Sequence, residues 1–458
     1  MKHVPQSGDP DGTGLPNVPA AAAAATAEAP SAPAGDGNEP RTSVRDVRLL
    51  WSANAADALG THVSAVAFPL LLLEFGYSPA VVGLLAGVGM LVALVCGPVV
   101  AVAADRGLRK PVMIVSAAVA AAAMTVVAAS VGDQRPSLGL LLTALLVERV
   151  ATACFEAAAR GTIALTSAPR DRVRTVSGLE AGDRAALVVG PALGGVLYQM
   201  SRALPFAADA ASYAVTAVCV RFMRSDLRAV DPATRRPPPA EEVVTAKPVA
   251  RDGSALRALH AFARETSTGF TLVRSAPLLR LVLAWTTTVN GALSALYFTA
   301  VFTLQGNGGS VAMGLVLAVA GGTGLVGSFV APAVVRRLGG ARTLVGVTWL
   351  MVAPSAGLAF VGGPWAYGIC FGTFCLILAP ATVVVQAAAI THTPTHLQAR
   401  AGAVLATSAL GAGAVAPLLA GSLVSRSGPA ASAVACAAAL VALALFTTAR
   451  AGRLKTGG

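Results

Sequence analysis

Charged residues are scarce in this 458-residue chain, because Asp, Glu, Lys and Arg together make up only 12% of it. Water-soluble globular domains carry about 25%. Hydrophobic residues make up 55%, and the mean hydropathy is +0.69, which excludes a water-soluble globular protein. Apolar runs of about 20 residues recur along the chain, and a helix of that length spans a bilayer core of about 30 Å. Lipid-facing strands would alternate polar and apolar residues, so the sequence predicts an all-α polytopic membrane protein.

Cysteine motifs and phosphate loops are absent as well. The six cysteines lie singly inside apolar runs without CxxC spacing, so we expect neither disulfides nor a metal site. No GxxxxGK[ST] loop is present, which argues against ATP hydrolysis by this chain. No nucleophile and base are arranged as in an enzyme, so we expect no catalytic activity and no cofactor.

Lysine is rare among the 34 basic residues, yet the formal net charge is +12. Such an excess could indicate nucleic-acid binding, but the arginines cluster at the ends of apolar runs and form no continuous basic face with interleaved aromatics. Positive charge in cytoplasmic loops explains this pattern better. The expected partners are the lipid bilayer, a small-molecule substrate and protons, with no nucleic acid, and we expect a monomer.

Two stretches lack apolar runs. Residues 1–43 mix Ala, Pro, Gly, Asp and Glu, cannot offset the entropy of ordering, and do not resemble a signal peptide. The second stretch runs from Met223 to about Ala276, and the pattern of its later part, Ser254 to Val273, predicts an amphipathic helix on the cytoplasmic surface. We therefore expect a disordered cytoplasmic tail at 1–43 and an N-terminal six-helix bundle at 44–223. A cytoplasmic linker at 224–276, a C-terminal six-helix bundle at 277–450 and a short cytoplasmic tail at 451–458 follow.

The apolar runs predict twelve transmembrane helices. They lie near 47–75, 79–104, 111–131, 137–164, 174–200, 205–222, 277–304, 311–335, 342–362, 364–390, 401–424 and 429–449.

The loops then alternate between two sides of the membrane, and their charges differ. Loops on the side of the N-terminus carry Arg106, Arg109, Lys110, Arg170, Arg172, Arg174, Arg336, Arg337 and Arg400. Loops on the other side offer only Arg135, Arg202 and Arg426. This asymmetry predicts a multi-pass protein of the cell (inner or plasma) membrane with both termini in the cytoplasm.

The two halves of the chain repeat one another at an offset of about 230 residues. Gly83-Leu84-Leu85 aligns with Gly314-Leu315-Val316, and Gly190-Pro191-Ala192-Leu193-Gly194-Gly195 aligns with Ala416-Pro417-Leu418-Leu419-Ala420-Gly421. An even number of helices per half makes this a parallel repeat, as in transporters that work by alternating access.

These features resemble the major facilitator superfamily. The charged turn Asp105-Arg106-Gly107-Leu108-Arg109-Lys110, the opening Leu49-Leu50-Trp51, the segment 190–195 and the sequence Ser275-Ala276-Pro277-Leu278-Leu279-Arg280 narrow the likeness. Together they resemble the drug-exporter branch that includes the enterobactin and macrolide efflux carriers, over residues 45–450. The chain departs from the family pattern of glycines at Ala101 and Gly107. It also departs at Thr61, where the branch often has an aspartate.

The resemblance implies a gating latch at the charged turn, formed by Asp105, Arg106, Arg109 and Lys110. In this role the aspartate holds neighbouring helices in the outward-facing form, and the basic residues orient the loop. The alternative is a topology signal alone, since any cytoplasmic hairpin collects basic residues.

The fifth predicted helix carries a segment that resembles an antiporter motif: Gly190, Pro191, Gly194 and Gly195. Small residues let helix backbones approach closely, and the proline weakens the hydrogen-bond ladder. Ser177 and Ala186 replace the glycines expected upstream, so plain tight packing is the alternative.

Charges inside the predicted helices are costly, about 2.5–3.5 kcal/mol each at the bilayer centre, so those that are retained usually act in the protein interior. Glu156 with Arg160 and Glu180 with Arg184 are spaced to pair along a helix, and Asp209 opens a helix, where the dipole favours an anion. The charges lie almost entirely in the N-terminal half: Asp57, Glu148, Arg149, Glu156, Arg160, Glu180, Asp183, Arg184 and Asp209.

Asp57, Glu148 and Arg149 lack such explanations. Glu148 and Arg149 are adjacent and point about 100° apart, so we expect them not to pair side to side. Burial disfavours a charged carboxyl group, which suits Asp57 or Glu148 to bind a proton on one side and release it on the other. A lone histidine on an apolar helix is more often a packing residue. The candidates for proton coupling or substrate binding are Asp57, Thr61, His62, Glu148, Arg149 and Asp183.

The C-terminal helices are nearly uncharged and offer Trp285, Asn290, Tyr297 and Gln386 as pocket candidates. An acidic N-terminal half facing an apolar, aromatic C-terminal half suits an amphipathic and cationic substrate. The resulting hypothesis is proton-coupled efflux of amphipathic small molecules, such as antibiotics or other natural products. An importer or uniporter of the same fold, or a non-transporting sensor or interaction protein, is the alternative.

Overall fold

The computed structural model describes residues 43–105, 109–133, 136–168, 170–225, 276–304, 309–391, 393 and 398–450, without the side chains of residues 97–105, 132–133, 164–165, 173 and 399–400. The predicted tail, the amphipathic linker helix and Arg106 therefore lie outside the described residues.

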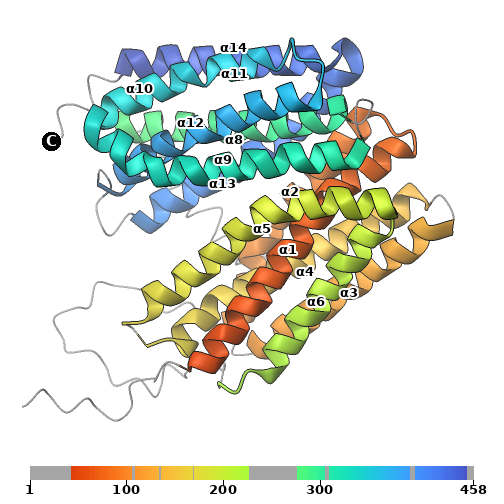
Figure 1. Cartoon of the computed structure of the whole chain (residues 1–458). Coiled ribbons are helices and arrows are strands. Elements are labelled where there is room, and N and C mark those ends of the chain that lie inside the picture. The colour runs from red at the N-terminus through yellow and green to blue at the C-terminus, as the bar shows by residue number, and fades with distance from the viewer. Residues whose placement is uncertain are drawn as a thin grey trace, which may run out of the picture. The chain divides into compact units, whose positions relative to one another are not determined.

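Every element in the described ranges is an α-helix (Figure 1). The helices are α1 (Val44–Glu74), α2 (Pro79–Asp105), α3 (Arg109–Asp133), α4 (Leu138–Thr166), α5 (Arg172–Met200), α6 (Leu204–Phe222), α8 (Pro277–Leu304), α9 (Gly309–Leu338), α10 (Gly340–Leu350), α11 (Val352–Gly357), α12 (Pro364–Thr391), α13 (Gln398–Ser427) and α14 (Pro429–Arg450).

Nine helices in the described part of the chain are long and apolar enough to cross a membrane. Helix α5 is outside this set, but its 29 residues still reach roughly 43 Å at 1.5 Å per residue. The prediction of an all-α polytopic membrane protein is confirmed. The predicted spans coincide with single helices, except that α10 and α11 share the span predicted near 342–362.

The prediction of one continuous helix near 342–362 is wrong, because the chain breaks at Met351 between α10 and α11. Pro354 lies in the first turn of α11, where its missing N–H costs no helical hydrogen bond. If helix α10 continued through Pro354, the proline would remove one backbone hydrogen bond and its ring would clash with the preceding turn. The second helix therefore begins anew.

The helices pack in two groups, α1–α6 and α8–α14. The first group encloses an apolar core that includes Leu72, Val127 and Phe206, each at most 1% exposed. The second encloses a larger core with Leu296 and Phe374 completely buried. The second core also takes in Val66 and Leu70 of α1, so the two groups share part of their apolar packing.

The two groups also contact each other, and the described contacts run from one end of the helices to about their middle, where a Cβ on Gly321 would lie 3.1 Å from the Leu187 carbonyl oxygen. We call that end the Glu74 side, where α1 ends and α2 begins, and the opposite end the Ser43 side. On the Glu74 side α2 packs against α13: a Cβ on Gly83 would overlap the carbonyl oxygen of Pro417, and one on Gly421 would overlap that of Pro79.

A second contact joins α5 to α9 in the same manner. A Cβ on Gly314 would overlap the carbonyl oxygen of Pro191, and one on Gly195 would overlap that of Ser310. Since Gly83 aligns with Gly314 in the repeat, and Pro191 with Pro417, the two contacts are equivalents of one another. Only glycine permits backbones to approach this closely.

Helix α5 presents a second row of small residues to α1, with one small residue every four positions. A Cβ on Gly178 would overlap the Trp51 ring, and one on Gly182 would lie 3.3 Å from the Ala55 Cβ. The sequence interpretation looked for the upstream glycines at Ser177 and Ala186 and so missed this row. It consists of Gly178, Gly182, Ala186, Gly190 and Gly194.

Candidate functional site

A layer of polar side chains lies inside the first helix group, between α1, α4 and α6. Its acids are deeply buried, with Asp57 7%, Glu148 1% and Asp209 0% exposed. In a membrane protein every such group must find partners within the protein. The layer is therefore the strongest candidate for a functional site.

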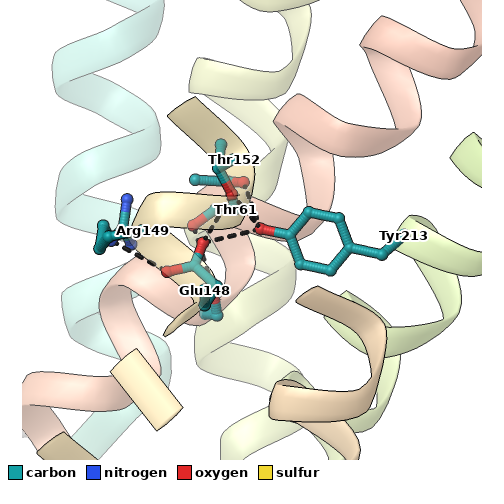
Figure 2. A network of polar contacts seen from close by, with 6 residues as sticks. Thr61, Glu148, Arg149, Thr152 and Tyr213 are labelled. Carbon is teal, nitrogen blue, oxygen red and sulfur yellow. Dashed lines mark hydrogen bonds and ion pairs between the residues drawn. The ribbon is translucent and has the colours of Figure 1, made fainter. Parts of the chain in front are cut away.

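Glu148 of α4 is held by two hydroxyl groups (Figure 2). Tyr213 Oη of α6 donates to Glu148 Oε1 at 2.7 Å, and Thr152 Oγ1 donates to the same oxygen at 3.2 Å. Tyr213 Oη also lies 3.1 Å from Thr152 Oγ1 and 3.3 Å from Thr61 Oγ1 of α1. One tyrosine hydroxyl thus links all three helices.

Glu148 and Arg149 form an ion pair, contrary to the expectation that adjacent residues would not pair. Arg149 Nε lies 3.0 Å from Glu148 Oε2, and Figure 2 shows the arginine side chain curled toward the carboxylate. The 100° angle between the Cα–Cβ directions governs short side chains, whereas the long arginine stem bends back around the helix. The Arg149 side chain is 27% exposed and that of Glu148 is 2% exposed, so only the cation reaches accessible space.

Asp209 is not explained by the helix dipole, which corrects the interpretation made from sequence. It is the sixth residue of α6, and the first turn of that helix holds no acid. The dipole effect fades within the first turn. A Cβ on Gly60 of α1 would lie 2.5 Å from Asp209 Oδ1, so the missing side chain at Gly60 makes room for this carboxyl group.

The remaining charged residues that the sequence singled out in the first group lie nearer its surface. Asn54 Nδ2 of α1 donates to Asp183 Oδ1 of α5 at 2.6 Å, with both partners partly buried. Glu156 pairs with Arg160 at 3.3 Å, and both are exposed. The predicted pair Glu180 and Arg184 is wrong, since these two exposed residues form no ion pair in the described structure. Exposed side chains gain little from pairing and lose conformational freedom.

His62 lies on the face of α1 that packs against α5, where its Cβ sits beside Gly190. It is partly buried. Its neighbour Thr61 faces α6 instead, through Tyr213. The helical rotation between adjacent residues therefore separates these two candidates, and only Thr61 belongs to the polar layer.

Two residues of the charged turn bind backbone carbonyl groups within the first helix group. Arg109 Nη1 donates to the Gly161 carbonyl of α4 at 2.8 Å, and Lys110 Nζ donates to that of Met223 after α6 at 2.6 Å. Cations at helix C-termini are favoured by the dipole. Asp105 ends α2 without a described side chain, so the latch stays a prediction.

The aromatic and amide candidates of the second group lie in different surroundings. Trp285 is a core residue, 3% exposed, and its Nε1 donates to Thr348 Oγ1 at 3.1 Å, so its place in a pocket stays a prediction. Asn290 is partly buried, with Nδ2 donating to its own helix at the carbonyl of Thr286. Gln386 is exposed on α12.

Tyr297 is the candidate that reaches the other helix group. Its Oη donates to the carbonyl oxygen of Ala65 in α1 at 3.3 Å, and the ring lies within electrostatic range of Arg149. Tyr297 and Arg149 are both partly exposed. They mark the place where the polar layer meets the second group.

The Glu74 side carries a polar cluster of its own. Tyr198 Oη donates to Glu74 Oε2 at 2.6 Å, and Arg202 pairs with the other carboxylate oxygen. A cavity next to this cluster is also lined by Gly309 and Ser310 at the start of α9. The cluster thus lies where α5 and α9 meet.

No group of metal-ligating side chains is found among the described residues. The polar layer offers carboxyl groups that can bind protons, hydroxyl groups that can donate and accept hydrogen bonds, and a guanidinium group that keeps its positive charge. Several of its members were missed in the sequence, namely Ser64, Thr152, Ser212, Tyr213 and Thr216, and Asp209 was noticed but assigned to the helix dipole. For the residues on α6, the sequence pattern that could have found them is the spacing of 209, 212, 213 and 216, which places four polar residues on one face of the helix.

Residues 50–417 match the family model of the Major Facilitator Superfamily. The chain belongs to this superfamily. No curated protein matches the chain. The superfamily comprises transporters, so the chain is a multi-pass membrane protein of a transporter family rather than of an enzyme family.

Solved transporter structures share this fold at low sequence identity. The nucleoside transporter NupG is 12% identical with a TM-score of 0.65, covering 88% of this chain and 98% of that one. A POT family transporter in complex with a thioalcohol conjugated peptide is 10% identical with a TM-score of 0.67, covering 89% and 96%. The human organic anion transporter MFSD10 (TETRAN) is 17% identical with a TM-score of 0.58, covering 88% and 99%. At these identities the likeness shows the fold alone.

Proposed function

We propose that the protein is a secondary transporter that exports amphipathic small molecules, such as antibiotics or other natural products, in exchange for protons. The observation that carries this proposal is the set of buried carboxyl groups between α1, α4 and α6, in the core of a transporter fold. Ionisable groups at membrane depth are costly and mark ion or proton pathways. The absence of a phosphate loop favours a gradient over ATP as the energy source.

The contacts between the helix groups support alternating access. The described contacts of α2 with α13 and of α5 with α9 run from the Glu74 side to about the middle of the helices. Loop charges favour the Ser43 side as cytoplasmic. These two points support the proposal of a form that is closed toward the outside and that takes up substrate from the cytoplasm.

The loop charges also lead us to propose the placement of the chain. The protein lies in the cell membrane with both termini in the cytoplasm, residues 1–43 and 224–276 serve as tail and linker, and the protein works as a monomer.

A susceptibility panel in a bacterial host without its own efflux pumps tests the proposed function. Expression should raise resistance to some amphipathic compounds, and energised cells should extrude ethidium until a protonophore collapses the gradient. Efflux that continues unchanged without the gradient contradicts proton coupling. Gradient-driven uptake in place of efflux supports an importer of the same fold.

A further inference from the structure

The three buried carboxyl groups of the polar layer differ sharply in what surrounds them. Glu148 faces a cation, Arg149 Nε at 3.0 Å, and accepts hydrogen bonds from Tyr213 and Thr152. A negative charge on this carboxylate is therefore compensated within the protein. Glu148 needs no proton to remain buried.

Asp57 and Asp209 have no cation paired with them in the described structure. Asp57 Oδ1 and Asp209 Oδ2 are buried without a hydrogen-bond partner, and no ion pair joins either side chain in the described structure. The Ser212 hydroxyl is shared between Asp209 Oδ1, at 3.4 Å, and the Asp209 carbonyl oxygen, at 2.8 Å. The Ser64 hydroxyl is shared between the Asp209 carboxyl group and the Thr61 carbonyl oxygen, at 3.2 Å.

The charged groups around these two aspartates do not supply a cation that would compensate an ionised carboxylate. The strongest electrostatic neighbours of Asp57 are acids on α4, α5 and α6: Glu156, Asp209, Glu148 and Asp183. Those of Asp209 are Glu148 and Arg149, and this arginine contacts Glu148. Helix α3, which also packs on α6, has no charged residue between Pro111 and Val131.

The two aspartates lie about one helical turn apart across the α1–α6 contact. These helices run antiparallel here, because Thr216 Oγ1 donates to the Ala53 carbonyl oxygen while Asp209 meets Gly60. Asp57 precedes Gly60 by three residues and so lies on the same face of α1. Asp57 keeps 7% of its surface exposed, whereas Asp209 is fully enclosed.

We propose that Asp57 and Asp209 together form the proton-binding site, while Glu148 stays ionised beside Arg149. A proton from water converts the Asp57 carboxylate to the acid and can pass to Asp209, which stores it. An ionised, unpaired carboxylate is unfavourable at this depth, so the resting form carries the proton. The role of this site in driving transport rests on the proposed proton-coupled function; its protonation does not.

Infrared spectroscopy of the full-length protein in lipid vesicles tests the assignment without any substrate. A protonated carboxyl group has a C=O stretch separate from the carboxylate bands. The wild type should show this band at neutral pH, Asp57→Asn or Asp209→Asn should reduce it, and Glu148→Gln should leave it. A missing band, a band unchanged in both aspartate variants, or a band removed by Glu148→Gln overturns the proposal.

A conservative variant covers the case in which Asp209→Asn does not fold. Asp209→Glu keeps the carboxyl group but lengthens the side chain and changes its surroundings. The C=O stretch contributed by residue 209 should therefore shift in frequency. A band that stays unchanged in Asp209→Glu contradicts a proton on Asp209.

Transport of ethidium separates this proposal from the proposed function. In vesicles with an imposed proton gradient, Asp209→Asn should lose uphill ethidium transport but keep ethidium exchange without a gradient. Uphill transport at the wild-type rate overturns a coupling role for Asp209. If the wild type itself moves no ethidium uphill, the export function fails for this probe, and the infrared bands alone decide the proton assignment.

Discussion

Tyr213 contributes most at the scale of single residues, because one hydroxyl group contacts Glu148, Thr152 and Thr61. It is 1% exposed and comes from α6, a helix in which the sequence interpretation placed no candidate. The aromatic ring fills the core while the hydroxyl group satisfies a buried carboxylate. Both properties are needed at this position.

Replacing Tyr213 with phenylalanine should therefore destabilise the protein by about 1–3 kcal/mol, because Glu148 loses its shortest hydrogen bond. Thermal unfolding of the purified protein in detergent measures the change. Tyr198→Phe is the matched control: its hydroxyl group donates to Glu74 near the surface, where water can replace it. An equal loss in both variants contradicts a special role for the buried hydroxyl.

The ion pair of Glu148 and Arg149 leads to a second prediction. Arg149→Met should cost about 3–5 kcal/mol of stability, because it leaves a buried carboxylate without its cation. The double variant Glu148→Gln with Arg149→Met removes both charges and should recover much of the loss. Thermal unfolding of both variants measures this, and a double variant less stable than Arg149→Met contradicts the pair.

At the scale of elements, glycines decide which helices can touch. Helix α9 shows this within one element: Gly314 lies against the Pro191 carbonyl group, whereas a Cβ on Gly322 would meet no atom within 4 Å. The two glycines look alike in the sequence. Only the neighbouring helix distinguishes them.

Gly314→Ala should destabilise the closed Glu74 side by about 1–3 kcal/mol, because the added methyl group overpacks a backbone contact. Gly322→Ala, in the same helix, should instead stabilise by about 0.5–1 kcal/mol, since alanine favours a helix. Thermal unfolding of the two variants side by side gives the sign of each effect. The same sign in both contradicts the α5–α9 contact.

The span near 342–362 illustrates a limit of prediction at this scale. Its apolar length indicates one membrane crossing, and that crossing is present. Pro354 was visible in the sequence, but an internal proline can kink a helix or end it. Packing of α11 against α12 and α14 accompanies the break, and packing is not a local property.

At the scale of the whole molecule, the repeat places equivalent residues at equivalent contacts between the halves. Gly83 meets Pro417, and Gly314 meets Pro191. Both contacts must separate if the Glu74 side opens during transport.

A cross-link across this side should therefore stop transport. Ala80 N donates to Ser425 Oγ at 3.1 Å, so cysteines at these two positions, in a chain without native cysteines, are close enough to join. Oxidation should abolish ethidium efflux and reduction should restore it.

The matched control joins two helices of the same group. Thr299 Oγ1 of α8 lies 2.8 Å from Ser432 Oγ of α14, and a cysteine pair there should cross-link with little effect on efflux. Full efflux with the Ala80–Ser425 cross-link in place contradicts opening of the Glu74 side.

The sequence by itself determined the membrane class, the all-α fold and nearly every helix, because hydrophobic length and composition are local properties. It also singled out Asp57 and Glu148. Only the tertiary structure decided that Glu148 has a cation and the Tyr213 hydroxyl beside it while Asp57 and Asp209 form no ion pair in the described structure, because side-chain direction and helix packing set these surroundings. Tyr213 lies 65 residues from Glu148 in the sequence. The orientation of α4 and α6 about their axes brings the two side chains together, and neither segment alone encodes that orientation.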